Sequence, residues 1–132
     1  MIGIARHVYV AETDAEAGRI AERAGAAWFK NFSKLWRDNG GLPTRYSGDL
    51  AGMKSVDAMV CGSPSTVRAE IERQMSATGC NYFVGRFAYG DLTLEESMSS
   101  LALFTGEVMP YFGTRPGAAG VTPRSGAGAK AA

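Results

Sequence analysis

The sequence lacks several of the residues and patterns on which common active sites depend. It has one histidine, His7, and two cysteines, Cys61 and Cys80, whose spacing matches no metal-binding motif. A Walker loop and a GxGxxG motif are also missing. With a single histidine, hydrolysis by a Ser-His-Asp triad is not expected, and no metal site is predicted. Two cysteines without metal spacing indicate free thiols in a reducing, cytoplasmic environment.

The sequence also lacks any apolar run of about 18 residues, and no basic segment with a cleavage site follows Met1. We therefore expect no transmembrane helix and no secretory signal. Its 14 Lys and Arg nearly balance its 13 Asp and Glu, so nothing points to nucleic acid or an anionic membrane as a partner. A chain of 132 residues with 45% hydrophobic and 20% charged residues fits one globular domain or part of one.

What the sequence does contain is an alternation of β-rich and amphipathic segments. In chain order we expect a strand over 4–11, a helix over 13–39, a loop over 40–55, a strand over 58–61, a helix over 63–78, a strand over 81–88 and a helix over about 93–110. Strands that alternate with helices predict an α/β fold with a parallel sheet and right-handed crossovers.

Local signals mark the ends of these helices. Residues 13–16 and 93–96 both match the capping-box pattern, and Ser63 and Pro64 suit the N-cap and the first helical position. A glycine, Gly79, predicts the end of the second helix. The last helix is expected to present one apolar face, formed by Leu94, Met98, Leu101 and Val108.

Composition divides the chain into a folded part and a tail. Residues 113–132 are mostly Gly, Ala and Pro, so they bury too little apolar surface to offset the entropy of ordering. We predict one domain over 1–112 and a disordered tail over 113–132. Within the domain, Cys61 ends one strand and Cys80 precedes the next parallel strand. The two thiols should therefore lie at opposite ends of the sheet, too far apart for a disulfide.

Three stretches resemble the C-terminal end of the bacterial luciferase-like family of flavin-dependent monooxygenases. They are HVYVAETDAEA (7–17), GSPSTVRAEIE (62–72) and TGCNYFVGRFAYGDLTLEESMSSLALFTGEVMPYF (78–112). The family fold is an eight-stranded (β/α) TIM-type barrel, so the resemblance implies the last three βα units, with parallel strands, over residues 4–112. It also implies reduced FMN, O₂ and a small organic substrate, although a minority of the broader family uses a deazaflavin.

The resemblance implies candidate site residues, because barrel enzymes build their sites at the carboxyl ends of the strands. Gly62 and Ser63 could cradle a flavin phosphate, but a simple helix cap is the favoured interpretation. Arg86 could face the flavin or an anionic substrate group, or could hold an ion pair. His7 could shuttle a proton, although a satisfied structural histidine is favoured. No residue is assigned a catalytic role.

Three of eight barrel strands would leave open edges, so the isolated chain is expected to be an incomplete catalyst. We expect weak flavin binding, and either self-association or a need for the missing N-terminal barrel part. The apolar residues expected to be exposed are Ile4, Val8, Val10, Phe83 and Phe87. Two alternatives remain: an inactive remnant, or a small flavodoxin-like interaction or nucleotide-binding module. The glycine-free loop over 12–14 argues against phosphate binding after the first strand.

Overall fold

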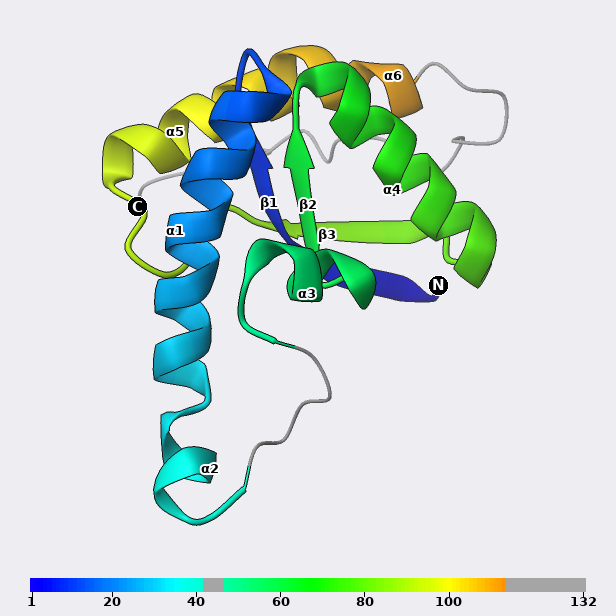
Figure 1. Cartoon of the computed structure of the whole chain (residues 1–132). Coiled ribbons are helices and arrows are strands. Elements are labelled where there is room, and N and C mark those ends of the chain that lie inside the picture. The colour runs from blue at the N-terminus through cyan, green and yellow to red at the C-terminus, as the bar shows by residue number, and fades with distance from the viewer. Residues whose placement is uncertain (42–46, 114–132) are drawn as a thin grey trace, which may run out of the picture.

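A computed structural model of the chain describes residues 1–41 and 47–113 (Figure 1). The elements are β1 (Gly3–Val10), α1 (Asp14–Phe32), α2 (Lys34–Asp38), α3 (Leu50–Ser55), β2 (Met59–Gly62), α4 (Pro64–Thr78), β3 (Tyr82–Arg86), α5 (Leu94–Leu103), the π-helical turn η1 (Phe104–Val108) and α6 (Met109–Gly113). Except for Gly113, the predicted tail lies outside the described residues. In the described ranges, no helix is long and apolar enough to cross a membrane.

The three strands form one parallel sheet, which confirms the predicted α/β class. Their order is β2-β1-β3, with β1 in the centre. The second half of β1 pairs with β2, from His7 opposite Met59 to Val10 opposite Gly62. The first half pairs with β3, ending with His7 opposite Arg86. Three consecutive barrel units would instead place the strands in chain order, with β2 in the middle, so this order differs from the one that the resemblance implies.

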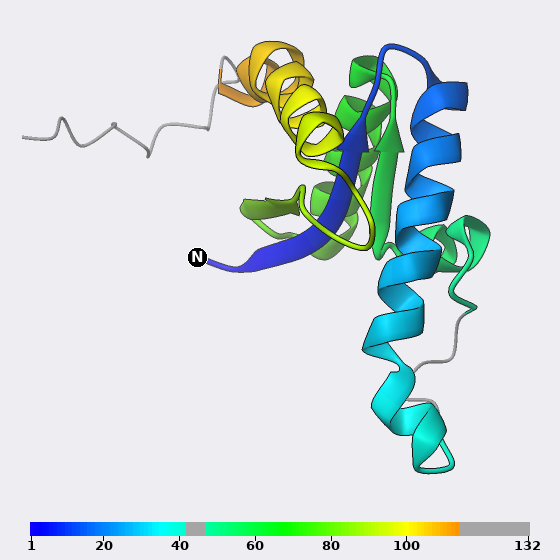
Figure 2. The same cartoon turned by 90° about the vertical axis from the view of Figure 1, so that its left-hand side faces the viewer.

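Helices cover both faces of the sheet. On one face Tyr9, Met59 and Cys61 pack beneath α1 and α3. On the other face Val8, Val10 and Val60 pack against Val67 and Ile71 of α4 and against Val108 of η1. Figures 1 and 2 show α1 and α3 on one side of β1 and β2, and α5 and α6 on the other. A barrel keeps its helices on the outer face alone, so this layering is that of an open, doubly covered sheet.

The two helical layers overturn the expectation that apolar strand residues are exposed. Val8 and Val10 are fully buried, because α4 and η1 cover the face to which they point. Ile4, Phe83 and Phe87 are partly buried. The sheet face that would have been open in an isolated barrel segment is thus closed by the chain's own helices.

The first helix is not continuous as predicted. It ends at Phe32, and α2 starts at Lys34. Between them Ser33 is fully buried, and its hydroxyl and amide both donate to the carbonyl oxygen of Phe29. A serine that bonds back to the preceding turn commonly bends a helix, and the apolar periodicity that continues across it hid this break. At the start of α1, Thr13 caps the helix by accepting from the amide of Glu16, as predicted, but the return bond of the predicted capping box, from the Thr13 amide to the Glu16 side chain, is not found there.

The segment expected to be a loop contains a short helix, α3. Asp49 caps it by accepting from the amide of Gly52. Its only buried side chain, Met53, packs into the cluster beneath α1. Six residues with one buried position are too few to show a helical period, which is why the sequence pattern did not reveal this element.

The last helix begins at the predicted capping box, formed by Thr93 and Glu96. Its buried face differs from the prediction, because Leu94 is 80% exposed and Met98 is 56% exposed. The buried residue of α5 is Ser100, whose hydroxyl accepts from the amide of Val10 at 2.8 Å. This hydrogen bond requires the polar side chain of Ser100 to point toward β1. The π-helical turn then rotates the inward-facing side of the helix, so that Val108 is buried.

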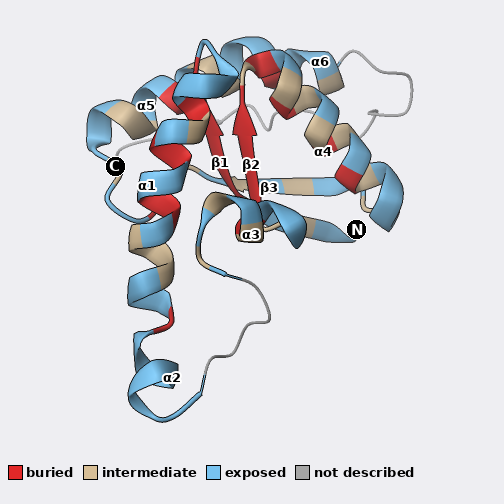
Figure 3. Cartoon of the chain, viewed as in Figure 1, coloured by how far each residue is buried: buried red, intermediate tan, exposed pale blue. Residues whose placement is uncertain are grey.

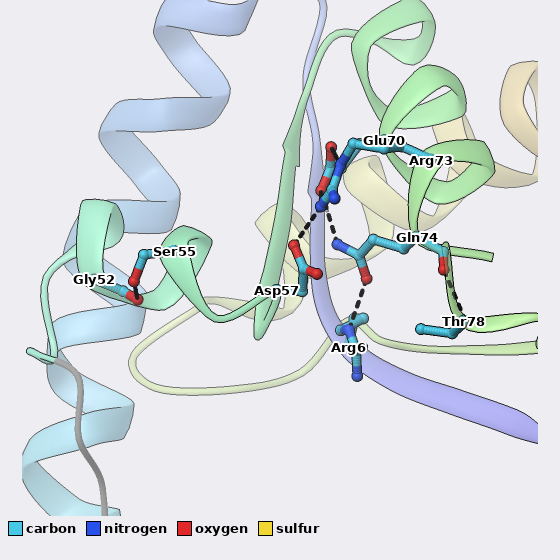
Figure 4. A network of polar contacts seen from close by, with 8 residues as sticks. All are labelled: Arg6, Gly52, Ser55, Asp57, Glu70, Arg73, Gln74 and Thr78. Carbon is cyan, nitrogen blue, oxygen red and sulfur yellow. Dashed lines mark hydrogen bonds and ion pairs between the residues drawn. The ribbon is translucent and has the colours of Figure 1, made fainter. Parts of the chain in front are cut away.

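A polar network joins the start of β1 to α4 and to the turn before β2 (Figure 4). Arg6 donates to Gln74 at 2.7 Å, and Gln74 donates to Glu70 at 2.8 Å. Arg73 pairs with both Glu70 and Asp57. Gln74 is fully buried with its amide satisfied, so the network fixes the position of α4 against the strands.

Candidate functional site

The sequence-predicted candidate with the least ordinary environment is His7, in the middle of the central strand. Its ring is 1% exposed and lies 4.4 Å from the ring of Trp28 and 4.6 Å from that of Tyr89, between ring centroids. Trp28 comes from α1, and Tyr89 follows β3. The imidazole is therefore enclosed by aromatic side chains from two different segments.

Neither nitrogen of this imidazole has a hydrogen-bond partner within the described residues. The sequence interpretation of a satisfied structural histidine is therefore not met. Burial disfavours the imidazolium, and the nearby charge of Arg86 opposes it further, so the pKa of His7 falls to about 4. At neutral pH the ring is neutral, with one donor and one acceptor left unmatched. Such a ring can accept or donate a proton only if a polar group reaches it.

Arg86 is the last residue of β3 and lies directly opposite His7 in the strand register. Arg86 is exposed, and none of the ion pairs among the described residues involves it. The alternative of an ion pair at this position thus has no partner there. An exposed, uncompensated guanidinium can bind phosphate or carboxylate with two parallel hydrogen bonds.

The predicted phosphate cradle at Gly62 and Ser63 is already occupied by a side chain of this protein. The Asp14 carboxylate accepts from the backbone amide of Ser63 at 2.7 Å. This hydrogen bond, with others from the Ser63 and Thr66 side chains, holds the pKa of Asp14 below its usual value. Ser63 is the N-cap residue of α4 as predicted, but its hydroxyl contacts Ser65 and Thr66 and makes no capping hydrogen bond. A phosphate bound here would have to displace Asp14.

The close approach of Asp14 explains why a glycine precedes Ser63. Gly62 has φ of 156°, and a Cβ there would lie 2.8 Å from an Asp14 oxygen and 2.7 Å from the Thr66 side chain. The turn therefore has no room for a larger residue while Asp14 stays bound.

The structure does not gather the three predicted cofactor-binding residues into one site. Along β1, Gly62 pairs with Val10, whereas Arg86 pairs with His7. Three residues of strand separate these levels, which is about 10 Å. Arg86 is instead brought beside His7, an association that the strand order creates and that the sequence alone did not suggest.

The described residues contain neither an activated cysteine nor a group of side chains placed to bind a metal ion. Cys61 and Cys80 are free thiols, as predicted, and Cys61 is buried. Burial raises the pKa of the Cys61 thiol, which keeps it protonated and a poor nucleophile. No group of three or more His, Cys, Asp or Glu within 1–41 and 47–113 is placed to hold a metal ion.

A groove that the sequence did not predict follows the open edge of β2. It has a volume of about 510 Å³. It is lined by Lys54, Met59, Cys61, Thr66, Ala69, Glu70 and Arg73. Because it depends on β2 lying at the edge of the sheet, only knowledge of the strand order could have revealed it.

The chain shows limited similarity to known proteins. No family model matches it. It is 26% identical over 114 residues to a protein of Sinorhizobium fredii described as "Uncharacterized protein y4wF", a match that covers 85% of this chain and 33% of that protein. The chain thus spans about a third of the length of this curated relative.

Two solved structures resemble the fold. One is a type II Baeyer-Villiger monooxygenase from Pseudomonas putida, the oxygenating constituent of 3,6-diketocamphane monooxygenase, in complex with FMN. It is 27% identical, has a TM-score of 0.61, and the match covers 82% of this chain and 32% of the enzyme. The other is the monooxygenase RslO1 from Streptomyces bottropensis, 19% identical with a TM-score of 0.59 over 83% of this chain and 30% of that one, which is a likeness of fold.

Proposed function

We propose that this chain corresponds to the C-terminal part of a luciferase-like flavin-dependent monooxygenase that oxidises a small organic substrate with O₂ and reduced FMN. The observation that carries this proposal is the 27% identity and TM-score of 0.61 with an FMN-bound monooxygenase over 82% of the chain. The sequence resemblance over residues 4–112 points the same way. Since the chain spans about a third of that enzyme, the other two thirds would supply the remaining cofactor contacts.

The residues present fit FMN at one of the two proposed positions. Arg86 offers an exposed cation without an ion-pair partner in the described part of the chain, which suits the phosphate of FMN or an anionic substrate group. The amide of Ser63 fits less well, because Asp14 already occupies it. When bound, reduced flavin would supply the activation of O₂, and the protein would bind, orient and exclude water. His7, beside Arg86, would remain neutral during this work.

The test is to join this chain to the complementary two thirds of the Pseudomonas putida enzyme and to titrate the chimera with FMN. We expect micromolar binding by the chimera and no comparable binding by the chain alone. Arg86→Ala should weaken FMN or substrate binding about tenfold without lowering Tm. Arg19→Ala, which removes an exposed arginine from α1, is the matched control. A monomer of the chain alone that binds FMN and consumes O₂ with a cyclic ketone would overturn the proposal of an incomplete enzyme.

A second candidate function is a small α/β binding module without oxygen chemistry. The observation that favours it is the order β2-β1-β3 with helices on both faces, which is the layout of flavodoxin-like open sheets. In such sheets ligands bind where the connections diverge, here between β1 and β3, next to His7 and Arg86. This candidate predicts that the chain alone binds a flavin or nucleotide tightly and consumes no O₂, the opposite of the first proposal.

A further inference from the structure

The sheet has two open edges, and each presents unpaired main-chain groups. Ala58, just before β2, accepts from His7 of β1 at 3.1 Å, and Gly62 at the end of β2 accepts from Ala11, just after β1, at 3.2 Å. Because parallel strands direct alternate residues to opposite sides, Met59 and Cys61 turn their amides and carbonyls away from β1. No backbone hydrogen bond in the described residues satisfies these groups.

The opposite edge belongs to β3. His7 lies opposite Arg86 in the register but donates its amide to Ala58 on the β2 side, so Arg86 and, by alternation, Val84 and Tyr82 direct their main-chain groups toward β1. Phe83 and Gly85 therefore direct theirs outward. The side chains of Tyr82 and Val84 share one sheet face, where Tyr82 is 49% exposed and Val84 is 39% exposed. Figure 3 shows the alternation of exposed and half-buried residues in β3, in contrast to β2, which is buried throughout.

The two edges have complementary shapes. The edge of β2 is recessed, because it forms one wall of the groove between Lys54 of α3 and the α4 residues Thr66, Ala69, Glu70 and Arg73. β3 lies at the margin of the fold and extends away from α1 and α3 (Figure 2). Two recessed β2 edges cannot reach one another, whereas a projecting strand can enter a recessed edge.

We propose that β3 of one copy adds to the open edge of β2 in the next copy, so that the chain associates head to tail. In a continued sheet, Tyr82 and Val84 would lie on the same face as Met59 and Cys61 and would be covered by α3 of the neighbour. The contact would pair the unpaired main-chain groups of both strands. Since it joins two different surfaces, the assembly keeps one free edge at each end, and growth stops only if a ring closes.

The two surfaces can be blocked separately in the full chain. Val84→Lys places a charged side chain at an exposed position of β3 and leaves its main-chain pairing with β1 unchanged. Ala69→Arg places a long side chain in the groove from an exposed position on α4. The matched control for the second change is Ala77→Arg, on the same helix outside the groove. Sedimentation velocity over a concentration series measures association, and far-UV circular dichroism checks folding.

We expect the wild type and Ala77→Arg to form dimers and larger species as concentration rises. Each edge variant alone should dissociate about tenfold more readily. Mixing Val84→Lys with Ala69→Arg should restore association, but only to a dimer, because one partner retains its groove and the other retains its strand. If Val84→Lys does not fold, Tyr82→Lys, at the other exposed position of β3, replaces it. A monomeric wild type, or edge variants whose mixture stays monomeric, would overturn the proposal.

Discussion

Val60 and Val84 are both valines in parallel strands of one sheet, yet Val60 is fully buried and Val84 is 39% exposed. They represent two regions, which we call the β2 half (β2 with residues 7–10 of β1) and the β3 half (β3 with residues 3–6 of β1). The β2 half is covered on both faces, by α1 with α3 and by α4 with η1. The β3 half is covered mainly on the face of Phe83 and Phe87. The strand pairing is alike in both halves, so the helices around them decide how much each contributes to stability.

The largest effect that tests this difference is expected where the loop after β3 meets α1. Gly90 has φ of 63°, and a Cβ there would lie 1.9 Å from the carbonyl oxygen of Ala24. Gly90→Ala should therefore lower the free energy of unfolding by more than about 3 kcal/mol, through backbone strain and a backbone clash. Gly79→Ala is the control, since its φ is 67° but nothing lies within 4 Å, and about 1 kcal/mol is expected. Equal losses in urea denaturation would show that the contact with α1 is unimportant.

The next effect depends on pH and concerns His7, where the two halves meet. Its pKa is about 4 in the fold and near 6.5 in an unfolded chain, so the unfolded state binds more protons between these values. Stability should thus fall as pH drops from 6.5 to 4, by about 3 kcal/mol in total from this group. His7→Phe removes the titrating nitrogens and should flatten this part of the profile of unfolding free energy against pH. An unchanged slope would mean that other groups cause the acid sensitivity.

A smaller effect compares the two valines directly. Val60→Ala should cost about 2 kcal/mol, because it leaves a cavity beneath α4. Val84→Ala should cost less than about 1 kcal/mol, because its side chain is partly in water already. Chemical denaturation of both variants at low protein concentration gives the comparison. Similar losses would indicate that β3 is covered in solution, for example by a second copy.

The smallest effect concerns Val10 at the end of β1, whose amide is bonded by Ser100 of helix α5 and not by a neighbouring strand. Ser100→Ala would leave the amide of Val10 buried without its acceptor, at a cost of about 1.5 kcal/mol. Ser76→Ala, at an exposed position of α4, is the control and should change stability by less than about 0.5 kcal/mol. Hydrogen exchange at Val10 should accelerate in Ser100→Ala, and a protected amide would contradict the role given to Ser100.

The sequence predicted the elements better than their arrangement. Helix starts at Thr13, Pro64 and Thr93 and the end at Gly79 are set by neighbouring residues, and all are found. Strand order is set by contacts between residues about 80 positions apart, such as Asn81 with Ile2, for which local periodicity carries no signal. The predicted barrel order came from the resemblance alone, and it differs from the observed β2-β1-β3.

The candidate site shows the same limit. Gly62, Ser63 and Arg86 were predicted because they end strands, which local sequence reveals. Whether they meet depends on the strand register, and here Arg86 meets His7 instead. The hydrogen bond from the Ser63 amide to Asp14 connects residues that are 49 positions apart in the sequence. The lack of hydrogen-bond partners for the His7 ring depends on its aromatic neighbours, which come from α1 and from the loop after β3. Neither has a signature in the sequence.

The hydrogen bond between Val10 and Ser100 spans 90 positions of the chain. During synthesis β1 leaves the ribosome well before the hydroxyl that satisfies the amide of Val10. Until Ser100 follows, that amide and the strand edge beside it are open to any extended segment nearby. Completion of this edge is therefore an event of high contact order, which slows folding and prolongs exposure of the edge. The newly made chain is thus most aggregation-prone in the interval between the release of β1 and the release of α5.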